Sequence, residues 1–146
     1  MSGLDFRYVE QLVVALVLTS VTVVIHGFGM KWVRHRFKRY SSVATAHQRP
    51  GSLPVMIGVV AIMVVTHAVE VLVWALFYWL RGLFPHWVSA VYFSIASYTT
   101  LGESGMTLPV HWQGLGGFEA MAAMLMFGWS TAVLAAVSLK IHSIDT

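Results

Sequence analysis

The stretch that decides the fold is PHWVSAVYFSIASYTTLGESG, residues 85–105, which lies between two long apolar runs. Its apolar part, residues 85–101, is too short and too rich in hydroxyl groups to cross a membrane, which takes about 20 apolar residues. A helix over residues 86–97 would be about 18 Å long at 1.5 Å per residue, roughly half of a bilayer. Non-helical backbone at membrane depth is tolerated only where it is buried in protein or lines water. The stretch therefore predicts a re-entrant segment, which enters and leaves the membrane on one side.

Three apolar runs surround this segment, at residues 8–30, 53–80 and 114–139, and each is long enough to cross a bilayer. Of the 146 residues, 58% are hydrophobic and 10% are charged. A soluble domain has about 45–50% apolar and about 25% charged residues. The composition thus excludes an ordinary soluble domain and a disordered chain. It predicts an all-α membrane protein with three transmembrane helices plus the re-entrant helix and its loop. The absence of cysteine excludes a disulfide framework and a thiolate site.

The basic residues predict the orientation in the membrane. Six of the nine Lys and Arg residues fall within residues 31–52, which we interpret as a basic cytoplasmic loop by the positive-inside rule. We expect the helix of residues 1–30 to begin outside, and a short tail, residues 141–146, to lie in the cytoplasm of a bacterium with the protein in its inner membrane. The loop also fits anionic lipid headgroups over residues 31–49, and we expect no nucleic-acid partner. The six basic residues are Lys31, Arg34, Arg36, Lys38, Arg39 and Arg49.

A re-entrant helix followed by a glycine-containing strand has the chemistry of a cation site. The helix directs its carbonyl end, with about half a negative charge, toward the bilayer centre. The backbone after it can turn successive carbonyls toward an ion and replace its hydration shell. Gly102 permits the backbone angles that this requires. Because one such loop cannot enclose a hole, several chains must surround the pore.

Residues 90–102, AVYFSIASYTTLG, resemble the pore region of tetrameric potassium channels and their small bacterial relatives. In that family a pore helix that ends in Thr-Thr-x-Gly-Tyr-Gly-Asp forms the selectivity filter between an outer and an inner helix. The resemblance implies a homotetramer in which residues 53–140 of each chain form a pore module. It implies a pore helix at 86–97, a filter at 99–105, an inner helix at 114–139 and a gating bend at Gly128. The filter residues are then Thr99, Thr100, Leu101, Gly102, Glu103, Ser104 and Gly105.

The filter departs from the family pattern at its outer end, where ESG at residues 103–105 replaces Tyr-Gly-Asp. The carbonyls of residues 100–102 could still line the inner ion sites. Ser104 removes the second glycine, and four copies of Glu103 would form an acidic ring at the outer mouth, which favours cations and can hold a divalent ion. We therefore expect relaxed selectivity, with K⁺ and also Na⁺ or Ca²⁺ as permeant ions, and no resident cofactor.

Three further polar residues are expected to support the filter. His67 and Glu70 are three residues apart and share a face of the second helix. A mid-membrane ionisable residue is a functional hypothesis by default. Glu70 would bond to hydroxyls of the pore helix or filter; a purely structural pair is the alternative. Glu119 lies near the positive start of the last helix, where it either neighbours the filter or only pairs with the helix dipole. The scattered histidines and the Met-rich run at 121–126 predict no metal site.

The sequence as a whole predicts a cation channel and not an enzyme. It contains no nucleophile elbow, phosphate loop or exposed acid–base pair, and no helix carries the regular arginines of a voltage sensor. Two alternatives stay open. The first is a non-conducting accessory or structural membrane subunit that retains the channel fold. The second is a pH-responsive membrane protein that uses His67 and Glu70.

Overall fold

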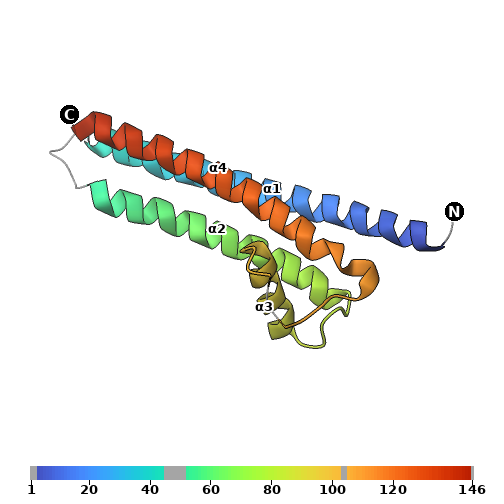
Figure 1. The fold of residues 1–146 in the computed structure, drawn as a ribbon. Coiled ribbons are helices and arrows are strands. Elements are labelled where there is room, and N and C mark those ends of the chain that lie inside the picture. The colour runs from blue at the N-terminus through green and yellow to red at the C-terminus, as the bar shows by residue number, and fades with distance from the viewer. Residues whose placement is uncertain (1–2, 45–51, 103–104, 146) are drawn as a thin grey trace.

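A computed structural model of the chain describes residues 3–44, 52–102 and 105–145, and within these residues the fold is all-helical, without a β-strand (Figure 1). The prediction of an all-α fold is therefore confirmed. A short 3₁₀ turn, η1, precedes the last helix. The elements are α1 (Gly3–Ala44), α2 (Ser52–Leu80), α3 (Trp87–Tyr98), η1 (Val110–Trp112) and α4 (Gly114–Asp145).

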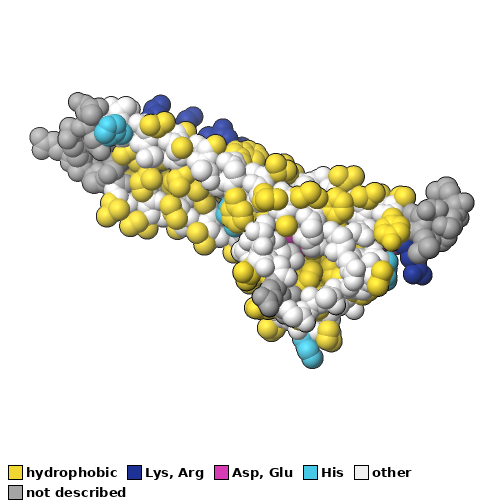
Figure 2. Space-filling view, viewed as in Figure 1, with side chains coloured by type: hydrophobic (Ala, Val, Ile, Leu, Met, Phe, Trp, Pro, Cys, Tyr) yellow, Lys and Arg dark blue, Asp and Glu magenta, His cyan; other side chains and the backbone are white. Residues whose placement is uncertain are grey.

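Three of these helices are long and apolar enough to cross a membrane, as predicted. The qualifying stretches are Arg7–Arg39 in α1, Leu53–Leu80 in α2, and Val110–Ser143, which includes η1 and α4. Apolar side chains spread over the face of the bundle shown in Figure 2, where a soluble protein would present charged residues. This surface identifies the chain as a membrane protein by its composition.

The long helices lie side by side in an elongated bundle, and α3 with its flanking loops forms a lobe beside the C-terminal half of α2 (Figure 1). Helix α1 packs against α2 and α4, and α3 packs against the same two helices. The chain termini lie at opposite ends of the bundle (Figure 1). The loop that follows α3 returns to the end of the bundle where α2 finishes and α4 begins.

The first helix extends through much of the segment that we predicted as a basic loop. It has 42 residues, about 63 Å at 1.5 Å per residue, twice the hydrocarbon core of about 30 Å. Residues 31–44 are helical because they contain neither Gly nor Pro and because an apolar face continues through them. Met30, Val33 and Phe37 are buried against α2 and α4, while the cations between them, such as Arg34, are exposed. The prediction of a loop is thus wrong for residues 31–44; the remainder of it, 45–51, lies outside the described residues.

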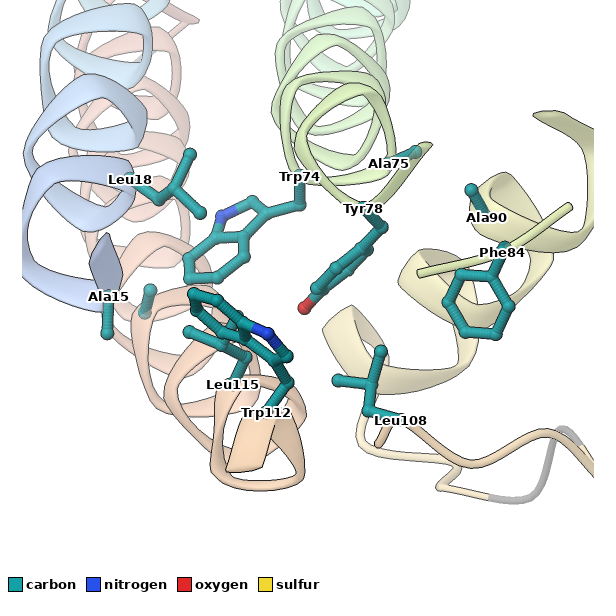
Figure 3. Close-up of a cluster of buried hydrophobic side chains, with 11 residues drawn as sticks. Ala15, Leu18, Trp74, Ala75, Tyr78, Phe84, Ala90, Leu108, Trp112 and Leu115 are labelled. Carbon is teal, nitrogen blue, oxygen red and sulfur yellow. The ribbon is translucent and has the colours of Figure 1, made fainter. Parts of the chain in front are cut away.

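A cluster of buried aromatic and aliphatic side chains fixes the lobe to the bundle (Figure 3). Trp74 and Tyr78 of α2 are fully buried, and the Tyr78 ring lies 5.2 Å from that of Phe93 on α3. Trp112 of η1 packs 5.9 Å from Phe77. Trp112 is buried, and its ring anchors the loop that returns from α3.

Candidate functional site

Helix α3 runs back along the second half of α2. Its first residue, Trp87, stacks edge-on against Trp79 near the end of α2, with ring centroids 5.9 Å apart. Its last residue, Tyr98, donates a hydrogen bond to Glu70. Because Trp79 and Glu70 are nine residues apart on α2, α3 descends about 14 Å along the bundle. The chain returns to its starting level at Trp112, so residues 87–112 begin and end at the same end of the bundle.

The backbone after α3 takes an unusual conformation. The Gly102 N–H donates to the Ala96 carbonyl at 3.0 Å and closes the helix. Thr100 and Gly102 have φ of 60° and 72°, and Leu101 between them does not have a positive φ. Glycine adopts such angles without cost, but a β-branched residue at positive φ is a genuine outlier. Strained residues of this kind cluster at functional sites.

The predicted filter residues are exposed where the structure describes them. Residues 99–102 lie on the surface of the single chain, with Leu101 70% exposed. Gly105 is also exposed, with a φ of 64°. Glu103 and Ser104 lie outside the described residues. Gly128 lies on the exposed side of α4, and a Cβ added there would meet nothing within 4 Å.

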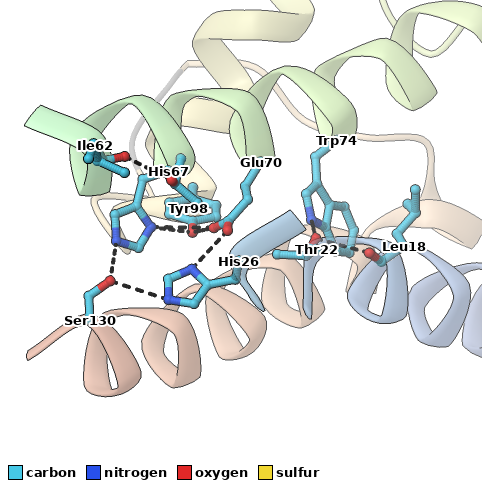
Figure 4. A network of polar contacts seen from close by, with 10 residues as sticks. Leu18, Thr22, His26, Ile62, His67, Glu70, Trp74, Tyr98 and Ser130 are labelled. Carbon is cyan, nitrogen blue, oxygen red and sulfur yellow. Dashed lines mark hydrogen bonds and ion pairs between the residues drawn. The ribbon is translucent and has the colours of Figure 1, made fainter. Parts of the chain in front are cut away.

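Five polar side chains from all four helices form a closed ring in the middle of the bundle (Figure 4). The Glu70 carboxylate contacts His26 Nδ1 of α1 at 2.9 Å and accepts the Tyr98 hydroxyl of α3. His67 Nδ1 lies 2.8 Å from Tyr98 Oη and 3.3 Å from Glu70 Oε2. Ser130 Oγ of α4 closes the ring, 3.1 Å from His67 Nε2 and 3.3 Å from His26 Nε2. We call these five residues the polar ring.

A second buried carboxylate binds the middle of α3. Glu119 accepts hydrogen bonds from Ser94 Oγ at 2.5 Å and from Tyr78 Oη at 2.7 Å. Ser94 Oγ also lies 2.9 Å from the Val71 carbonyl of α2. The Glu119 side chain is therefore directed at α2 and α3 and is fully buried. Its partners lie on these two helices, so its role goes beyond pairing with the dipole of its own helix. Glu70 and Glu119 together hold α3 at its end and at its middle.

Sequence reasoning missed most partners of these carboxylates. His26 was counted among scattered histidines, although it lies in the middle of an apolar run, as His67 does. The rule that singles out mid-membrane ionisable residues would have found it. A hydroxyl partner for Glu70 was predicted, and Tyr98 provides it. The partners of Glu119, Tyr78 and Ser94, carry no comparable signal, because hydroxyl residues are ordinary in helices of membrane proteins.

Three residues of the polar ring, His26, His67 and Glu70, bring their possible metal-ligand atoms close together. One ring nitrogen each of His26 and His67 and one carboxylate oxygen of Glu70 lie within 4.8 Å of one another. These side chains are buried or nearly so, with 0%, 15% and 0% of their surface exposed. The sequence did not predict this convergence, because it depends on how α1 packs on α2.

A cationic surface lies on α1, away from the polar ring. It forms a shallow hollow between aromatic and basic side chains. Figure 2 shows Lys and Arg side chains along one edge of the bundle. The hollow is lined by Phe28, Lys31, Trp32, Arg34, His35 and Lys38.

No protein-family model, curated protein or solved structure matches the chain. The resemblance to potassium-channel pore regions therefore rests on the sequence of residues 90–102.

Proposed function

We propose that the chain is one subunit of a homotetrameric pore-loop cation channel, with α3 as pore helix and residues 99–105 as selectivity filter. The observation that carries this proposal is the path of residues 87–112, which starts and finishes at one end of the bundle and reaches its middle at Tyr98. A simple hairpin of two helices would not include a short helix that reaches the middle of the bundle and a loop that returns to the same end.

The electrostatics of α3 support cation binding. Its C-terminal end lies at the level of Glu70, and the carbonyl end of a helix carries about half a negative charge. The residues just beyond it are two threonines, Leu101 and Gly102, with left-handed angles on both sides of Leu101. This backbone can turn carbonyl oxygens toward an axis, the arrangement that replaces an ion's hydration shell.

The surface of the lobe supports several copies around one axis. Exposed backbone at membrane depth must line water or be covered by protein, and residues 99–102 are exposed in the single chain. Val88, Tyr92 and Ile95 form an exposed stripe on α3 that leads to these residues. Cyclic assembly would cover the stripe with a neighbouring copy and enclose residues 99–102 on the axis.

Selectivity and orientation follow from the sequence. Four copies of Glu103 would ring the outer mouth and attract K⁺, Na⁺ or Ca²⁺. The basic end of α1 would lie in the bacterial cytoplasm, in contact with anionic lipid, and the N-terminus outside. The channel needs no cofactor.

Ion flux into liposomes tests the proposal. Purified protein reconstituted into liposomes should pass K⁺ and Na⁺, and Glu103→Gln should lower the flux severalfold because it removes the acidic ring. Glu10→Gln is the matched control, since Glu10 is an exposed carboxylate paired with Arg81 at 2.7 Å. Flux no higher than in empty liposomes, with incorporation verified by flotation, would instead favour the non-conducting accessory subunit.

A further inference from the structure

We propose that His26, His67 and Glu70 bind one divalent transition-metal ion of the Zn²⁺ class, which ties α1 to α2. This inference does not rest on conduction and holds for a channel or a silent subunit alike.

The geometry of the three donors suits such an ion. Two imidazole nitrogens and a carboxylate oxygen are a known ligand set for Zn²⁺, with bonds of about 2.0–2.2 Å. In a tetrahedron of that size neighbouring ligand atoms lie about 3.4 Å apart. The distances present are 2.9 Å between His26 Nδ1 and Glu70 Oε1, and 3.3 Å between His67 Nδ1 and Glu70 Oε2. The three ligand atoms all lie within 4.8 Å of one another, so side-chain rotations would have to bring the two imidazole nitrogens and one carboxylate oxygen to metal-binding distances.

Ser130 orients both histidines in the way that metal ligands require. Its Oγ lies 3.1 Å from His67 Nε2 and 3.3 Å from His26 Nε2. A hydroxyl oxygen has two lone pairs and can accept both Nε2–H groups. Each imidazole then carries its proton on Nε2 and directs the lone pair of Nδ1 toward the Glu70 side of the ring. A metal-binding histidine almost always donates its other N–H in this manner.

In this tautomeric state, a cation between the Nδ1 atoms and the oxygens would satisfy the lone pairs of both nitrogens. With Glu70 ionised, both Nδ1 lone pairs face oxygen atoms, and the Tyr98 proton is already used on Glu70. One divalent ion satisfies both nitrogens and the carboxylate at once, with the Tyr98 oxygen, 2.8 Å from His67 Nδ1, as a fourth ligand. The divalent ion and the Glu70 carboxylate together carry one net positive charge. If Tyr98 released its hydroxyl proton to solvent on binding the ion, the site would become neutral.

A proton is the rival occupant. If Ser130 donates to one imidazole, a single extra proton completes all five contacts of the polar ring, and no metal is needed. This proton-only ring corresponds to the pH-responsive alternative. The test must therefore detect the metal itself.

Metal content of the full chain provides that test. Tag-free protein in detergent is stripped with a chelator, incubated with Zn²⁺ or Co²⁺, desalted and measured for metal per chain. We expect one equivalent, and for Co²⁺ the strong visible absorption of a tetrahedral site. Glu70→Gln and His67→Asn should each weaken binding at least tenfold. Ser130→Ala, which removes no ligand, should weaken it by about 10–100-fold.

The control is His86→Ala, which removes an exposed histidine outside the polar ring and should leave binding unchanged. The wild-type Co²⁺ spectrum keeps the test decisive even if a variant fails to fold. A wild-type chain that retains no equivalent of metal, or one whose binding Glu70→Gln leaves unchanged, overturns the proposal in favour of the proton-only ring. Ion flux plays no part in this readout, so the channel proposal is tested separately.

Discussion

At the scale of single residues, two carboxylates hold α3 against the long helices. Glu119 accepts hydroxyl donors from α2 and α3, and Glu70 accepts Tyr98 at the end of α3. A buried carboxylate is costly unless donors satisfy it. The position of the backbone that follows α3 therefore depends on a few hydroxyl groups.

Tyr78→Phe tests this dependence. The change keeps the ring in its aromatic cluster but removes one of the two hydroxyl donors to Glu119. We expect a loss of about 1–3 kcal/mol, the cost of leaving a buried polar group short of a partner. Thermal unfolding in detergent measures the loss. Tyr8→Phe is the control, because Tyr8 is 56% exposed and lies outside the stripe on α3, and equal stabilities of the two variants would contradict the account.

The sequence predicted that Glu70 would bond to a hydroxyl of the short helix that follows α2, and Tyr98 of α3 provides that hydroxyl, but it did not predict the contact with His26. His67 and Glu70 were expected to share a helix face from their spacing of three, and their side chains do lie 3.3 Å apart. The contacts with His26, Tyr98 and Ser130 join helices that are far apart in sequence. Such contacts depend on how the helices pack, which hydrophobic periodicity along one chain does not specify.

At the scale of elements, close helix packing explains why a side chain is not tolerated at Gly29 but is tolerated at Gly128. Gly29 of α1 faces Thr66 of α2, and a Cβ added at Gly29 would overlap the Thr66 hydroxyl and lie 2.7 Å from its methyl group. Thr66 cannot easily turn away, because its hydroxyl donates to the Ile62 carbonyl at 2.8 Å. Small residues permit such close approaches between membrane helices.

Gly29→Ala and Gly128→Ala form a matched pair on this point. Alanine at position 29 forces α1 from α2 and should destabilise the chain by about 1–3 kcal/mol, as overpacking does. Alanine at position 128 meets open space and should leave stability equal or raise it by up to about 1 kcal/mol through helix propensity. If Gly128 provides a gating bend, the same variant lowers ion flux while it remains folded. Equal unfolding temperatures for the two variants would refute the packing argument.

The sequence predicted helix bounds correctly where a change in apolar composition marks them. The prediction was wrong where basic residues are interspersed with the buried face of a helix. The sequence placed the re-entrant helix at 86–97 and the structure has Trp87–Tyr98. It ended the first span at residue 30, because the basic residues that follow dominate the composition. Val33 and Phe37 continue the buried face at helical spacing, a signal that a periodicity reading would detect and a composition reading does not.

At the scale of the whole molecule, the proposed channel requires more than one chain. Its three long helices pack around two clusters of buried side chains. The exposed backbone of residues 99–102 must line water or be covered by protein if it lies at membrane depth. A ring of identical chains supplies that cover without any further protein.

Electron cryo-microscopy of the protein in lipid nanodiscs tests this central claim most directly. The account predicts particles with fourfold symmetry, in which α3 of each chain points its C-terminal end toward the axis and residues 99–102 line an open path along it. A monomer or dimer, or a tetramer whose residues 99–102 face lipid, would contradict it.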